Sequence, residues 1–184
     1  MNKLLLGFVA VALLSPVATA QTSTDPARAS VANIVDLWVT KIEVLTVPAA
    51  DALPEASYAF VPTAGEFAGV RTFGDQVKHL AAANYQLAAR ALHIEPPAGT
   101  HDEIAPASVR TKAEIITYLK ESFVWLHRAA KGLTLQNIED RIVLGRETES
   151  PLGVMIDAIA HSQNHYGQLV EYLRMNHVVP PASR

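Results

Sequence analysis

The sequence contains no cysteine, and this absence excludes several classes of protein at once. Disulfide scaffolds, zinc ribbons, thiolate clusters, cysteine nucleophiles and the C-x-x-C-H haem attachment all require a thiol. An acylated lipoprotein cysteine is excluded for the same reason. Any metal site in this chain therefore has to use imidazole and carboxylate ligands, and seven histidines are present to supply the former.

Positive charge is also scarce. The chain has 15 Lys and Arg against 18 Asp and Glu, a formal net charge of -3, and no run of basic residues. Nucleic-acid-binding domains concentrate basic residues to neutralise phosphates. We therefore expect no nucleic-acid partner.

Long apolar runs are absent except at the start of the chain, where Leu4 to Leu14 follows Lys3. Ala18 and Ala20 put small residues just before Gln21, which is the pattern of a secretory cleavage site. The run is shorter than the roughly 20 residues that span a bilayer. We predict a signal peptide over residues 1–20, a periplasmic or secreted protein, and no stable membrane association after cleavage. The alternative is an uncleaved membrane anchor.

Helical periodicity recurs in four places in the remaining chain, and no segment alternates with period two over a useful length. Between Thr134 and Glu149 the pattern weakens to irregular turns. The sequence therefore predicts one domain over residues 21–184 with an all-α fold, an antiparallel four-helix bundle with long connecting loops. The predicted helices start at Asp25-Pro26 and end at Pro48, run from Thr72 to Leu92, run from Thr111 to Gly132, and start at Ser150-Pro151 and end near Asn176.

His161 and His165 stand four residues apart on the last predicted helix and so share one face. Both imidazoles can bind one ion, at about 2.0–2.1 Å from each nitrogen. The main apolar stripe of the helix, which includes Ile156 and Ile159, lies on the opposite side. The histidines belong to a second row that includes Ala158. We expect one row to face the core or a site and the other to face another helix or a second subunit in a homodimer.

A third ligand has to come from another helix, and the residues leave two candidates. His79 lies in the middle of the second predicted helix, at the edge of its apolar stripe, and His127 on the third helix is its rival. The other histidines fall at a helix end, in a proline-rich loop and in the tail, where solvated imidazoles are expected: His93, His101 and His177.

Neighbouring polar residues suggest supporting roles and one exclusion. Asp75, one turn before His79, and Gln168, three residues after His165, are placed to hold an imidazole from behind. Asp75 can equally serve only as a helix-start carboxylate. In H-E-x-x-H metalloproteases a glutamate follows the first histidine, whereas Ser162 stands there in this chain, so a peptidase of that type is not expected.

Three segments of the chain carry a resemblance to a known family: Phe60-x-Pro62, Phe73-Gly-Asp-Gln-Val-Lys-His79, and His161-Ser-Gln-Asn-His165-Tyr-Gly-Gln-Leu-Val-Glu-Tyr-Leu-Arg174 with Pro180-Pro181. With these segments the chain resembles the DinB-like (DinB/YfiT) family of metal-binding four-helix bundles. The resemblance covers about residues 30–183 and implies that His79, His161 and His165 form a site for a divalent metal, completed by water. The proline-rich stretch from Pro96 to Pro106 and the predicted leader are not common to that family.

Three neutral imidazoles leave an ion with uncompensated charge and an open position, which is typical of catalytic rather than structural sites. Zinc or nickel is favoured, although nitrogen ligands also accept iron or copper. The first hypothesis is a hydrolase or transferase acting on an unknown small molecule. The resemblance implies this class, because characterised relatives include thiol-dependent transferases and isomerases. The alternative is a non-enzymatic metal- or ligand-binding bundle that acts through oligomerisation. A b-type haem bundle is a weaker third hypothesis, since H-x-x-x-H puts both imidazoles on one side of an ion.

Overall fold

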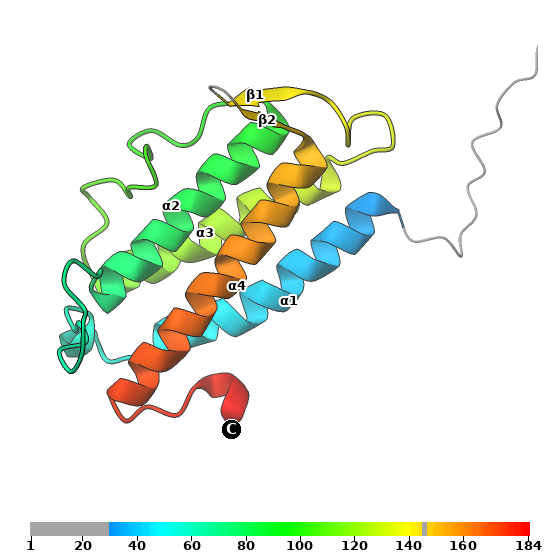
Figure 1. The fold of residues 1–184 in the computed structure, drawn as a ribbon. Coiled ribbons are helices and arrows are strands. Elements are labelled where there is room, and N and C mark those ends of the chain that lie inside the picture. Colours follow the sequence, from blue (N-terminus) through cyan, green and yellow to red (C-terminus); the bar gives the residue numbers. More distant parts are fainter. Residues whose placement is uncertain (1–29, 145–146) are drawn as a thin grey trace, which may run out of the picture.

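A computed structural model describes residues 30–144 and 147–184 of the chain. Four long helices pack side by side (Figure 1), with α2 against α3 and α4, and α1 against the same two helices. The predicted all-α four-helix bundle is confirmed. Its elements are α1 (Val31–Ala52), η1 (Glu55–Ser57), α2 (Phe73–Leu92), α3 (Lys112–Lys131), β1 (Ile142–Leu144), β2 (Glu147–Glu149), α4 (Pro151–Met175) and η2 (Pro181–Ser183).

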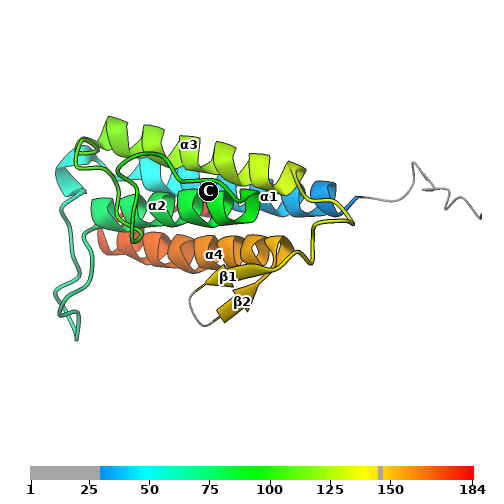
Figure 2. The same cartoon turned by 90° about the horizontal axis from the view of Figure 1, so that it is seen from above.

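Helices α1 and α4 run in one direction, and α2 and α3 in the other (Figures 1 and 2). Contacts at the helix ends agree with this arrangement. The Lys112 ammonium at the start of α3 donates to the carbonyl of Asp51 at the end of α1 (2.6 Å), and the Tyr172 hydroxyl near the end of α4 donates to the carbonyl of Arg71 just before α2 (3.0 Å). Because α2 and α3 are parallel neighbours, the segment 93–111 has to return along the bundle.

The helices begin where side chains can satisfy the first free backbone N–H groups. The Thr72 hydroxyl accepts from the backbone N–H of Asp75 (3.0 Å) at the start of α2. At the start of α3, Thr111 and Glu114 form a reciprocal capping box. Ser150 caps α4, with Pro151 in the first turn. These three predicted starts are confirmed, because capping depends on local residues alone.

The first helix differs from its prediction at one end. The expected start at Asp25-Pro26 lies outside the described residues, and the described helix begins at Val31 with Ser30 as its N-cap. The predicted end at Pro48 is wrong, because the helix continues to Ala52. Proline removes one backbone hydrogen bond, but the added turn buries Ala50 completely and lets its carbonyl accept a hydrogen bond from the Tyr58 hydroxyl (2.7 Å).

The connections contain more order than the sequence predicts. Where irregular turns were expected before α4, β1 and β2 form a short antiparallel hairpin in which Ile142 pairs with Glu149. Strands of three residues are too short to show a period-two pattern. In the first long connection, Tyr58 is buried against Phe73 and Phe60 lies edge-on to Tyr172, with ring centroids 5.2 and 5.9 Å apart. These aromatic contacts hold the connection to the bundle.

The core lies between the four helices and includes Leu80, Phe123 and Met155, all completely buried. The buried row of α4 also contains Ala158 and His165. The histidine row therefore faces the interior, whereas in the apolar stripe Ile156 is exposed and Ile159 is partly buried against the core. Among the helices of the described residues, none combines the length and the apolarity needed to cross a membrane.

Candidate metal centre

Helices α2 and α4 bring together three of the seven histidines. His79 points from α2 toward α4, and His161 and His165 lie one turn apart on α4. One nitrogen from each ring lies within 4.8 Å of the others. The ring centroids are 4.3 Å apart for His161 and His165, 4.8 Å for His79 and His165, and 5.4 Å for His79 and His161. The structure thus places the three sequence-predicted ligands around one point.

A side-chain amide holds one of the rings in place, and a backbone carbonyl holds a second. Nε2 of the Gln76 amide lies 2.5 Å from Nδ1 of His165 and 2.5 Å from Oε1 of Gln168. A joint flip of these two amides would present an oxygen to Nδ1, the partner that a metal-bound imidazole prefers. The backbone carbonyl of Glu103 lies 3.3 Å from Nδ1 of His79 and accepts from its N–H in the corresponding tautomer. In both rings Nδ1 is engaged, which leaves Nε2 for an ion.

The third ring has an unsatisfied atom. Nε2 of His161 is buried and has no hydrogen-bond partner among the described residues. A buried polar nitrogen without a partner costs free energy. A metal ion bound there would remove that cost. The donor set also fits, because imidazole nitrogens are ordinary ligands of zinc and of other divalent transition metals.

The electrostatic surroundings keep two of the rings neutral, as metal ligation requires. Burial, together with the neighbouring His161 and His79 rings and Arg71, lowers the pKa of His165 to about 3. Burial and the positive charge of Arg71 likewise lower the pKa of His79, although Glu103 opposes this shift. These two imidazoles are therefore unprotonated at neutral pH before any ion binds.

A cavity of about 320 Å³ opens beside His79 and gives the site a route to solvent. It lies between the start of α2 and the segment 93–111, so its walls carry both cationic and anionic groups. Of the three clustered histidines, only His79 lines this cavity. The cavity is lined by Arg71, Asp75, Lys78, His79, Asp102, Glu103, Ile104 and Ala105.

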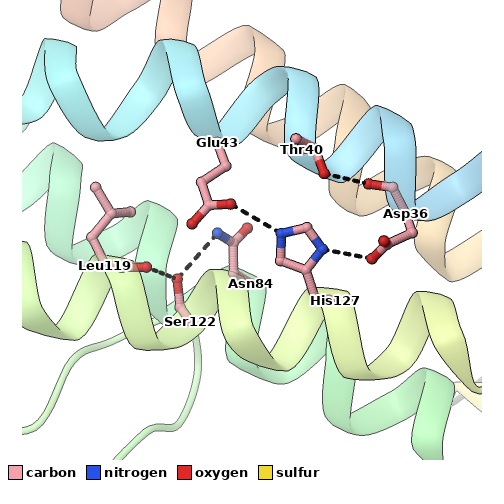
Figure 3. A network of polar contacts seen from close by, with 7 residues as sticks. All are labelled: Asp36, Thr40, Glu43, Asn84, Leu119, Ser122 and His127. Atoms are coloured by element: carbon pink, nitrogen blue, oxygen red, sulfur yellow. Dashed lines mark hydrogen bonds and ion pairs between the residues drawn. The ribbon is translucent and has the colours of Figure 1, made fainter.

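The rival third ligand, His127, lies elsewhere. It sits between α3 and α1, with Nδ1 2.6 Å from Asp36 and Nε2 2.9 Å from Glu43 (Figure 3). His127 is thus paired to two carboxylates and is not part of the three-histidine cluster. The remaining histidines, His93, His101 and His177, are exposed, as expected.

Two supporting roles that the sequence suggested turn out differently. The Asp75 carboxylate accepts from the Thr72 hydroxyl (2.7 Å) and pairs with Lys78 (2.7 Å), so it acts at the start of the helix and makes no hydrogen bond to His79 among the described residues. Gln168 reaches the site indirectly, through Gln76.

Sequence reasoning missed the two residues that touch the rings directly. Gln76 stands three residues before His79 on the apolar side of α2, where it is buried. A polar residue at such a position needs a buried hydrogen-bond partner, and this could have indicated its contact with His165. Glu103 had no such signal, because it lies in the long segment 93–111 and reaches His79 only through the path of that segment.

Comparison with known proteins agrees with the fold and the cluster. A family model described as the DinB superfamily matches residues 41–169, which is more than half of the chain and includes all three clustered histidines. No curated protein matches the chain significantly.

Proposed function

This chain belongs to the DinB superfamily, and from that premise we propose that it holds one divalent ion at His79, His161 and His165 and acts on a small molecule. The observation that carries the proposal is the convergence of these imidazoles, with Nε2 of His161 buried and unpartnered. Zinc or nickel suits such a ligand set. When bound, the ion would supply Lewis-acid chemistry at its open position.

The chain's own residues support hydrolytic or transferase chemistry by preparing the site. Gln76 and the Glu103 carbonyl hold two of the rings, which limits reorganisation when a ligand arrives. His165 is only 5% exposed, so water has little access from that side. The cavity beside His79 has room for a small molecule, with Arg71 and Lys78 available to orient it.

The structure also argues against a peptidase of the H-E-x-x-H type. Ser162, in place of the catalytic glutamate, is fully buried, and its hydroxyl donates to Oδ1 of Asn84 (3.0 Å). It therefore belongs to the packing between α4 and α2 and cannot reach a substrate. A base, if the reaction needs one, has to come from outside this motif.

Metal analysis tests the proposal directly. Protein purified without a metal-chelating tag should contain about one divalent ion per chain, and His79→Ala or His161→Ala should lose it. His127→Ala is the matched control, because that ring is bound to Asp36 and Glu43 and should leave metal content unchanged. Full metal content in the double variant His79→Ala/His161→Ala would overturn the site.

The alternative function is a metal- or ligand-binding bundle without catalytic activity, and the exposed apolar row of α4 favours it. Metal-loaded protein should be screened with hydrolytic and thiol-transfer substrates. Turnover that disappears in His161→Ala would support the enzyme. Inactivity across both classes, together with stable self-association, would support the binding protein.

We place the protein outside the cytoplasm, in the periplasm or secreted, on the strength of the leader pattern in residues 1–20. These residues lie outside the described part of the structure. The mass of the protein recovered from a secreting host should correspond to a chain that starts at Gln21. Recovery of the full-length chain in the cytoplasm would contradict this location.

A further inference from the structure

The segment 93–111 carries a carboxylate to the three-histidine cluster. Oε2 of Glu103 lies 3.5 Å from Nε2 of His79, while the backbone carbonyl of the same residue lies 3.3 Å from Nδ1. Glu103 therefore touches both nitrogens of one ring. Its carboxylate stands on the side of Nε2, the atom left free for an ion.

The backbone holds Glu103 in this place with an unusual conformation. Asp102 and Glu103 both have positive φ, 48° and 57°, and are flanked by paired backbone hydrogen bonds between His101 and Ile104. Turns of this kind favour glycine or asparagine at the second central position. In the orientation that satisfies its hydrogen bonds, the Gln86 side-chain oxygen accepts from the N–H groups of both residues at 2.8 Å. The turn is thus fastened to α2.

The distance from Glu103 to one of the three rings matches that of a shared ion. Two ligands bound about 2.1 Å from one tetrahedral ion lie roughly 3.4 Å apart, and Oε2 of Glu103 is 3.5 Å from Nε2 of His79. The carboxylate side chain is 48% exposed, so it is free to turn toward the other two rings. A carboxylate would also offset part of the charge that three neutral imidazoles leave on a divalent ion.

We propose that Glu103 is a fourth protein ligand, which occupies the open coordination position until a substrate displaces it. This inference rests on the proposed metal site. It adds that the resting site has the ligand set His₃Glu, and that a substrate binds by replacing a group that belongs to the segment 93–111. The Glu103 carboxylate then competes with the substrate for the open coordination position.

The test compares Glu103→Gln with Asp102→Asn in the full chain. Asp102 is the matched control, because it lies in the same turn with its side chain 93% exposed. Glu103→Gln should weaken zinc binding at least tenfold and alter the visible absorption of the cobalt(II)-substituted protein. Asp102→Asn should leave both unchanged. Glu103→Asp, which keeps the carboxylate on a shorter arm, should recover part of the affinity.

Each outcome separates this inference from the function on which it rests. If Glu103→Gln binds one ion with wild-type affinity and an unchanged cobalt spectrum, Glu103 acts only through its main-chain carbonyl and the inference is overturned, while the three-histidine site stands. If the wild-type protein binds no ion, both fail. Circular dichroism of the variants confirms that a loss of binding is not a loss of folding.

Discussion

At the scale of single residues, histidines in this chain occupy opposite electrostatic environments. His165 lies among other imidazoles and neutral amides, so burial lowers its pKa to about 3. His127 is also partly buried, which by itself lowers its pKa. Its contacts with the Glu43 and Asp36 carboxylates outweigh burial and raise the pKa above the ordinary value. The same side chain is thus prepared as a neutral ligand in one place and as a cation in the other.

The environment of His127 predicts a stability difference with a definite pH dependence. Because the folded-state pKa is raised, the contribution of His127 is fully present below its unfolded pKa of about 6.5 and is lost as pH rises through the folded value. We expect His127→Gln to lower the free energy of unfolding by about 1–2 kcal/mol at pH 6 and by much less at pH 9. Urea unfolding at both pH values measures this difference.

His101→Gln is the control for His127→Gln, because His101 is 69% exposed and lies in the turn before Glu103. It should show little change at either pH. An equal loss of stability for His127→Gln at pH 6 and pH 9 would mean that the imidazole contributes through packing and not through its charge.

Some of the site residues could be predicted from the sequence and others could not, for a physical reason. His161 and His165 share a face because helix geometry is local, and His79 stands on a shoulder of an apolar stripe. Glu103 reaches the cluster because parallel neighbours α2 and α3 require a long returning segment, which passes over His79. That path depends on how the helices pack, which no local pattern in residues 93–111 records.

At the scale of elements, α4 is a helix with two usable faces, and its sequence alone did not determine which one is buried. The apolar stripe has the larger residues, of which Ile156 is exposed and Ile159 is partly buried against the core. The histidine row contains Ala158 and Ser162, whose small side chains permit close approach to α2. The Ser162 hydroxyl and Nδ1 of His165 on this row have hydrogen-bond partners inside the bundle, which offsets the cost of burying them.

A buried polar network ties three helices together near this row. Nδ2 of Asn84 on α2 donates to the hydroxyl of Ser122 on α3 (3.2 Å), and that hydroxyl donates to the carbonyl of Leu119 (2.7 Å; Figure 3). The hydroxyl of Ser162 on α4 donates to Oδ1 of Asn84 (3.0 Å). Asn84, Ser122 and Ser162 are fully buried. The network therefore sets how α2, α3 and α4 meet.

We expect Asn84→Ala to destabilise the protein by about 3 kcal/mol, because it leaves a cavity and removes the partners of two buried hydroxyls. Ser162→Ala removes one hydrogen bond and should cost only about 1 kcal/mol. Chemical denaturation measures both. Equal losses for the two variants would show that Asn84 does not hold the network together, and Gln163→Ala, on the exposed side of α4, should be near neutral.

At the scale of the whole molecule, the three histidines join α2 to α4 across the bundle, so the ligand state of the site bears on the stability of the fold. Without an ion, neutral buried imidazoles oppose protonation. The unfolded chain binds protons to His79 and His165 below about pH 6.5, whereas the folded chain takes them up only at lower pH. The metal-free protein should therefore lose stability as pH falls from 6.5 toward 3.

An ion that binds only to the folded state should raise the free energy of unfolding at neutral pH. Zinc at a concentration a thousand times its dissociation constant stabilises the folded state by about 4 kcal/mol. The gain should shrink as pH falls, since protons compete for the same nitrogens. Thermal unfolding with zinc and with a chelator, at pH 7.5 and pH 5, measures the effect. His165→Leu should abolish the zinc-dependent shift and lessen the acid sensitivity of the metal-free protein, whereas His127→Gln should keep the zinc-dependent shift. A zinc-dependent shift of wild-type size in His165→Leu would show that the ion stabilises the protein from another site.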